Sequence, residues 1–245
     1  MAEWVTHLMV ADKVLERCPW LHRRGFCVGN IAPDCNVENE DWTQFTPPRK
    51  VTHWMQDQRK TAADCEPFYN EYVTGRCGQI AGKEQFSFLL GYYAHLITDA
   101  EFQRCIRDEE RVAAVWRRID AHPVLGVRGA AMPRNWDSVK LLISREERYR
   151  EMAALEAEYL EANPGSGYLT EILPLKEYPD YIDYLPAGSI VRKIGVMGSL
   201  PRKGTGEETY IGFSREEYSR FVSGAVELVL RQFAKKNAEE ICGRY

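Results

Sequence analysis

The chain has 245 residues, of which 44% are hydrophobic and 28% are charged, and these fractions are those of an ordinary globular protein. Its formal net charge of −4 at pH 7 argues against a nucleic-acid-binding protein that works by neutralising phosphates. A metal-dependent phosphoesterase stays allowed, because a bound dication supplies its own local positive charge.

The apolar stretches and the N-terminal segment predict a cytoplasmic protein. The longest apolar run covers residues 86–93, far short of the roughly 20 residues needed to cross a bilayer. An acid stands early, at Glu3, and no basic stretch precedes an apolar core, so the N-terminal segment does not resemble a secretion signal. The seven cysteines are scattered without a CxxC pair, which in such a chain predicts reduced thiols.

Helical periodicity recurs along the first half of the chain. A first helix is predicted from near Thr6, with its apolar side chains on one face. Residues 25–53 contain two glycines and three prolines and are predicted to form a long irregular connection, which needs an anchor or a function inside a compact domain. A second helix is predicted over residues 57–73, and a third begins near Lys83 and runs with a kink towards Ile119.

Two later helices are predicted from capping boxes. Residues 144–147 and 214–217 both read Ser-Arg-Glu-Glu, in which the serine accepts from an early backbone N–H and the last glutamate reaches back. Asn-Pro-Gly stops the first of these helices at residue 163. The following segment, to residue 213, is predicted to be either a lid over the helices or an extended strap. No repeat or linker divides the chain, which predicts an all-α fold in a single multi-helix domain over residues 1–245.

The clearest candidate metal ligands are His95 and Asp99. They lie four residues apart in a strongly helical segment, so their side chains share one face, with Cβ atoms about 5–6 Å apart. Neutral imidazole and carboxylate both bind zinc well. The alternative is a core histidine that hydrogen-bonds an aspartate one turn away. Because both ionisable groups lie in the apolar stretch FLLGYYAHLITDAEF, they need each other or a metal, and this favours the metal site.

Three further residues are weaker candidates by themselves. Asp34, in GNIAPDCN, is otherwise a turn aspartate, and His53, in VTHW, is otherwise a half-buried histidine packed on Trp54. Both lie in the predicted connection over residues 25–53. His7 stands near the start of the first helix, where the alternative is a residue that packs on the preceding tryptophan.

The remaining histidines and the cysteines are not predicted to be metal ligands. His22 and His122 lie in polar, turn-like segments and are predicted to be surface residues. The cysteines are predicted to pack in the interior; Cys105 is singled out because it lies ten residues beyond His95. The sequence contains no GxSxG, GxxxxGK[ST] or HExxH motif, which leaves other enzyme classes without a local signature.

Four short motifs, in their order along the chain, resemble the zinc-dependent phospholipase C family, which is related to the P1-type nucleases. They are HLMVADKVL, GNIAPD, TH and GYYAHLITD, and the likeness is clearest over residues 5–103. Two later stretches, YIDYLPAGSIVRKI and GFSREEY, resemble the shorter intracellular bacterial members. The resemblance implies an all-helical protein with zinc ions at the bottom of a cleft, where they bind phosphate oxygens and activate a water.

The resemblance also implies a ligand set. The ligands of one zinc would be Asp34, His53, His95 and Asp99. His7 would bind another zinc, which Asp99 would also touch. The family's further site uses two histidines and a glutamate, but here Cys105 stands at the first of these positions and no HxxxE follows. We therefore expect one zinc, and the residues allow a second through His7 and Asp99.

These features predict a zinc-dependent hydrolase of phosphoester bonds, a phospholipase C-like phosphodiesterase that uses a metal-activated water. Four protein ligands would close a zinc site, so Asp34 is the candidate general base. The expected substrate is a small phosphodiester or a phospholipid head group; nucleic acid is not expected, although a nuclease-like substrate stays open. The alternatives are a non-catalytic zinc-binding helical protein that binds a ligand or partner, and a metal-free helical binding protein. The sequence leaves the oligomeric state open.

Overall fold

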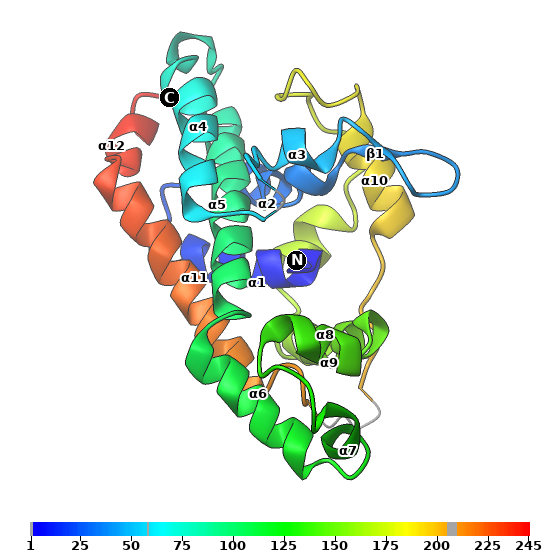
Figure 1. Ribbon diagram of the computed structural model, residues 1–245. Helices are drawn as coiled ribbons and strands as arrows, with labels where there is room; N and C mark the ends of the chain where they lie inside the picture. Colours follow the sequence, from blue (N-terminus) through cyan, green and yellow to red (C-terminus); the bar gives the residue numbers. More distant parts are fainter. Residues whose placement is uncertain (1, 58, 205–209) are drawn as a thin grey trace.

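The computed structural model describes residues 2–57, 59–204 and 210–245, and these residues are arranged mostly in helices (Figure 1). In the described part of the chain the strands are two antiparallel pieces, β1 (Val37–Glu38) and β2 (Phe45–Thr46). The predicted all-α fold is therefore confirmed. Within the same described residues, no helix combines the length and the apolar character that crossing a membrane requires.

The helices vary from single turns to the 23-residue helix α5. The α-helices are α1 (Trp4–Arg17), α2 (Arg23–Gly29), α3 (Arg49–Thr52), α4 (Glu66–Phe68), α5 (Lys83–Cys105), α6 (Glu109–Ala121), α7 (Leu125–Gly129), α8 (Trp136–Leu142), α9 (Arg145–Ala162), α10 (Ser189–Met197), α11 (Arg215–Lys235) and α12 (Ala238–Cys242). Short 3₁₀ turns are η1 (Ala32–Asp34), η2 (Ala62–Cys65) and η4 (Cys77–Gln79), and π-helical turns are η3 (Tyr69–Thr74) and η5 (Tyr168–Ile172).

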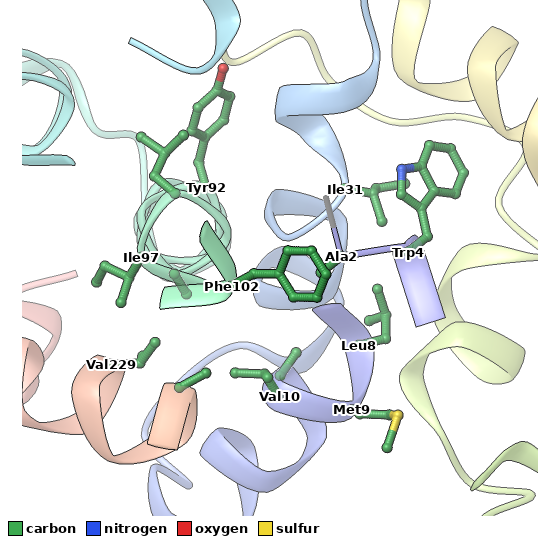
Figure 2. Packing of buried hydrophobic residues seen from close by; sticks show 14 of the residues in the cluster. Ala2, Trp4, Leu8, Met9, Val10, Ile31, Tyr92, Ile97, Phe102 and Val229 are labelled. Atoms are coloured by element: carbon green, nitrogen blue, oxygen red, sulfur yellow. The ribbon is translucent and has the colours of Figure 1, made fainter. Parts of the chain in front are cut away.

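Helix α5 is the centre of the fold. Every residue from 86 to 102 is buried, because α1, α2 and α11 pack around it. A helix that is apolar on all sides belongs in such an interior position. Figure 2 shows part of this core, with Val10 of α1, Phe102 of α5 and Val229 of α11 among its side chains.

Helix α2 corrects the prediction that residues 25–53 are irregular from their start. Its glycines serve a close helix–helix approach: a Cβ at Gly29 would lie 2.1 Å from the carbonyl oxygen of Phe88, and one at Gly91 would lie 2.2 Å from that of Phe26. Glycine lets two backbones come this near because it has no Cβ. The rest of the segment forms η1, the β1–β2 hairpin and α3, so the segment is structured by its packing.

Other predicted helix limits were partly wrong. The first helix begins at Trp4, before Thr6. The second begins only at Ala62, after a Thr61–Asp64 capping box, and passes through α4 into a π-helical turn. The predicted long third helix is two helices, since α5 ends and Asp108 caps α6 by accepting from the backbone N–H of Arg111 at 3.0 Å.

Both predicted capping boxes are confirmed, at Ser144 and at Ser214. Between the two capped helices, the described residues 164–204 and 210–213 are not one long irregular segment, because they contain η5 and α10; they pack against the core rather than forming a detached lid, and we call them the strap. Residues 205–209 of the predicted segment lie outside the described residues. The rings of Tyr178 and Tyr181 pack against that of Phe88 on α5, tilted and edge-on, with centroids 5.7 and 5.3 Å from it. The strap thus covers the same helix that carries His95 and Asp99.

Candidate metal centre

The five predicted site residues come together from four elements. His7 lies on α1, Asp34 ends η1 and His53 directly follows α3, while His95 and Asp99 lie on α5. They form two groups able to hold a metal ion, one of His7, His95 and Asp99, the other of Asp34, His53 and His95. In each group the ligand atoms lie within 4.8 Å of one another, and His95 belongs to both.

Hydrogen bonds orient two of the imidazoles. The Nδ1 of His95 donates to the carbonyl oxygen of Asn30, at 2.8 Å, which directs the lone pair of Nε2 into the site. The Nδ1 of His53 lies 2.9 Å from the Thr52 hydroxyl, which itself donates to the carbonyl oxygen of Arg49. The Thr52 oxygen can therefore accept from Nδ1, leaving the Nε2 of His53 as a ligand atom.

The distances between ligand atoms fit a tetrahedral cation. The Nε2 of His53 lies 3.3 Å from Oδ1 of Asp34, 3.3 Å from Nε2 of His95 and 3.5 Å from Oδ2 of Asp99. Ligands at zinc bond lengths in a tetrahedron lie about 3.3–3.6 Å apart. The pair of His95 Nε2 and Asp99 Oδ2 is wider, at 4.0 Å. Two imidazole nitrogens at 3.3 Å repel through their lone pairs unless a proton or a cation lies between them.

Unpartnered buried atoms give a second sign that a cation fits. Among the described residues, both ring nitrogens of His7 and the Oδ1 of Asp99 are buried without a hydrogen-bond partner. The His7 ring stacks on His95, with centroids 3.8 Å apart, and its Nε2 lies 3.6 Å from the same Oδ1. An unsatisfied buried polar atom costs about 1–3 kcal/mol, and a bound cation would remove that cost.

The charges of the site suit zinc. Burial and the neighbouring His7 lower the pKa of His95 to about 3, so its imidazole is neutral at pH 7. Burial alone would raise the pKa of Asp34 and of Asp99, but the adjacent histidines lower both below the ordinary range, and Arg49 adds to this at Asp99. Two ionised carboxylates and the neutral imidazole of His95 are ligands that zinc prefers.

Sequence reasoning missed Arg49. Its Nη2 donates to Oδ2 of Asp99 at 2.7 Å, and about a third of its side chain (35%) is exposed. Asp34 is the other site residue that water reaches, at 15% exposure against 1% or less for the histidines and Asp99. One arginine in PPRKVTH carries no local signal for this role, because only the tertiary fold brings it to a residue fifty positions away.

An aromatic network holds α3, and with it His53, in place. The Tyr92 hydroxyl donates to the carbonyl oxygen of Thr52, at 2.5 Å, and accepts from the Tyr184 hydroxyl, at 2.7 Å. Trp54 Nε1 completes the chain by donating to Tyr184 at 3.0 Å. Because Tyr184 belongs to the strap, the second half of the chain supports a residue of the metal centre.

The histidines outside the site accept hydrogen bonds at helix ends and are only partly exposed, so the prediction that they are surface residues holds in part. The Nδ1 of His22 accepts from the backbone N–H of Gly25, and that of His122 accepts from Val124 and Leu125; both rings are half-buried. Cys105 is half-buried at the end of α5 and belongs to neither metal-binding group of the described residues.

One N-terminal segment of the chain matches a known protein family. Residues 6–101 match the family model described as zinc dependent phospholipase C. No curated protein and no solved structure matches the chain. The matched span runs from α1 almost to the end of α5, and it contains all five residues of the centre.

Proposed function

Because the chain, through residues 6–101, belongs to the zinc-dependent phospholipase C family, we propose that it is a zinc-dependent phosphodiesterase that cleaves a phospholipid head group or a smaller phosphodiester. The family indicates a hydrolase with zinc as cofactor. One observation supports the proposal most strongly: potential ligand atoms of His7 and Asp99 are buried without hydrogen-bond partners, next to the 3.3 Å contact between the Nε2 atoms of His53 and His95. Since α11 packs on both α1 and α5, we extend the proposal to one domain over residues 1–245.

In this proposal His53, His95 and Asp99 would hold one zinc, with Asp34 as a fourth ligand or as the base, and His7 would hold a second together with Asp99. When bound, the zinc acts as a Lewis acid on the phosphoryl group and lowers the pKa of a water towards about 7. The side chain of Asp34 is more exposed than that of Asp99, so Asp34 can take a proton from water and release it to solvent.

Arg49 and the orienting residues complete the mechanism. The guanidinium of Arg49 lies at Asp99 with its Nε unpartnered, so it can donate to a phosphoryl oxygen as negative charge develops. Asn30 and Thr52 keep the rings of His95 and His53 in one orientation before substrate arrives. The reaction then needs little rearrangement of the chain, because each group is already placed.

Hydrolysis of bis(4-nitrophenyl) phosphate by zinc-loaded protein tests the proposal. We expect the activity to fall at least about 100-fold in His95→Ala, because a ligand change costs more than the loss of an outer residue. His122→Ala serves as the control, since His122 caps a helix away from the centre. If wild type and His95→Ala are equally inert on phosphodiesters and phosphomonoesters, the catalytic proposal is wrong.

The deep burial of the centre supports one alternative, a zinc-binding helical protein without catalysis. His7, His95 and Asp99 are at most 1% exposed, as expected for a zinc that ties α1, α3 and α5 together. Such a protein would bind zinc and lose thermal stability on chelation, yet it would hydrolyse no phosphoester.

A further inference from the structure

A cavity of about 320 Å³ lies next to the metal centre and is lined by an excess of cations. Its walls come from the end of α5, from α8 and α9, and from residues 212–213, and Arg49 closes one side. The cationic side chains that line it are Arg49, Arg107, Lys140, Arg145 and Arg148. Among the described lining residues the only carboxylate is that of Glu151.

Backbone N–H groups donate hydrogen bonds to both oxygens of the Glu151 carboxylate. The oxygens of Glu151 accept from the N–H groups of Ile211, Gly212 and Phe213, at 2.7–3.2 Å. These bonds hold the carboxylate at the backbone, and its single negative charge faces five cationic side chains in the lining. Lys140 is paired with Asp137, which does not line the cavity. The cavity therefore presents a positive field to an incoming ligand.

The guanidinium groups keep donors for a ligand. Arg145 donates from Nη2 to the Tyr149 hydroxyl at 3.0 Å, and Arg107 donates from Nη1 to Gln103. Each guanidinium has five N–H donors in a planar fork that matches phosphate, so these bonds occupy only part of what the cavity offers.

Arg49 and the end of α5 connect the cavity to the metal centre. Arg49, in its wall, donates to Asp99, and Phe102 of the wall lies one helical turn beyond Asp99 on α5. Arg145 of the wall also interacts with Glu3, which directly precedes α1, and α9 itself contacts α1.

We propose that this cavity binds a second anionic group of the substrate, so that the phosphodiester cleaved at the metal centre carries a further phosphate. The inference rests on the proposed function, which it makes more specific. Arginine forks bind phosphate through paired, charge-assisted hydrogen bonds. Trp136 and Phe102 offer apolar surface to the part of the ligand that joins the two phosphates. A cationic head group such as choline would meet repulsion here.

Calorimetry on the zinc-loaded full chain tests this with two probes that differ by one phosphate. We expect inositol 1,4-bisphosphate to bind at least about tenfold more tightly than inositol 1-phosphate, as one added set of charge-assisted hydrogen bonds provides. Arg145→Gln and Lys140→Gln, on different helices, should each remove most of this preference. The matched control Arg150→Gln lies on the same helix as Arg145, does not line the cavity and should keep it.

Two results overturn the inference. One is equal affinity of the wild type for both probes; the other is an equal loss of preference in Arg150→Gln. Arg148 is left intact because it donates to the carbonyl oxygen of Ile143 and supports the fold. Thermal unfolding and far-ultraviolet circular dichroism confirm that the variants are folded.

Activity distinguishes the inference from the proposed function. If the bisphosphate preference is present but no phosphodiester is cleaved, the function fails and the anion site stands. If glycerophosphocholine and glycerophosphoinositol 4-phosphate are cleaved with equal kcat/KM and the probes bind equally, the function stands and the inference fails. Vesicles that contain phosphatidylinositol 4-phosphate, compared with glycerophosphoinositol 4-phosphate in solution, show whether a lipid or a soluble ester supplies the phosphate; preferential cleavage of either over its unphosphorylated counterpart supports the inference.

Discussion

The metal centre and the cationic cavity are neighbours, yet they are built in opposite ways. The centre lies within residues 6–101, and its histidines are almost fully buried. Its potential ligand atoms contact one another or have no hydrogen-bond partner among the described residues. Most of the cavity wall comes from residues after 101, and Arg145 and Lys140 are exposed to water. Core packing thus sets the geometry of the buried centre, whereas solvent-exposed cations act through a screened field.

This difference indicates how the two regions divide the work. Buried ligands hold their positions to within small displacements, which chemistry at phosphorus requires. Exposed cations tolerate substitution and act on the choice of substrate. Changes in the first region should therefore affect zinc and stability, and changes in the second should affect ligand preference. The following predictions test that division, starting with the largest expected effect.

Loss of His95 should remove the metal. We expect His95→Ala to bind less than about half an equivalent of zinc, because His95 belongs to both ligand groups and zinc binding contributes to folding. Elemental analysis of the purified protein measures this. Chelation of the wild type should lower its Tm and leave the Tm of His95→Ala almost unchanged. A wild-type melting curve that does not change after zinc is demonstrably removed would contradict the role of zinc in stability.

A methyl group at Gly91 should destabilise the helix pair that supports the centre. A Cβ there would lie 2.2 Å from the carbonyl oxygen of Phe26, so α2 must move away from α5. We expect Gly91→Ala to lose about 2–3 kcal/mol in the free energy of urea unfolding. Gly165→Ala is the control, because a Cβ at Gly165 meets no atom within 4 Å. Equal stabilities would show that the two helices do not need this close approach.

Glu156 joins the two regions and should make stability depend on pH. It lies on α9, and its carboxylate accepts from the backbone N–H and hydroxyl of Thr6 on α1. Burial raises the pKa of Glu156 from 4.5 to about 8, despite the opposing hydrogen bonds of Thr6. The folded state therefore retains a proton that the unfolded state releases, so this contribution is complete below pH 4.5 and is lost as the pH rises to about 8.

Between pH 4.5 and about 8, the free energy of unfolding should fall by at most about 1.4 kcal/mol per pH unit because of Glu156. Glu156→Gln, which is neutral throughout, should flatten this part of the pH dependence of unfolding. Glu161→Gln, on the exposed side of the same helix, should keep the wild-type slope. Identical slopes for wild type and Glu156→Gln would show that the carboxylate is ionised in the folded protein.

The smallest effect is expected at a helix cap in the second half of the chain. Ser214→Ala removes the acceptor for the backbone N–H of Glu217 and should cost about 1 kcal/mol of stability, without changing zinc content or probe affinity. Ser219→Ala, exposed within the same helix, should have little effect. A change in zinc content on losing this cap would mean that the two regions are not independent.

Local patterns were enough to predict part of this molecule. The capping boxes at Ser144 and Ser214 and the one-turn spacing of His95 and Asp99 depend on residues within a few positions of each other. Backbone hydrogen bonding and helical periodicity act over that range, so the sequence by itself determined the all-α class and the helical pair. Asp34, His53 and His7 were placed with that pair only through the order of the family's motifs.

Tertiary structure alone decided the rest. The glycines at 25 and 29 indicated a loop by local criteria, but close contact of α2 with α5 makes them packing positions, and α2 leads directly to Asn30 and Asp34. Arg49 reaches Asp99 across fifty residues, and the cavity joins α5 to α8 and α9. Such contacts depend on how buried surfaces fit together, and no short stretch of sequence contains that information.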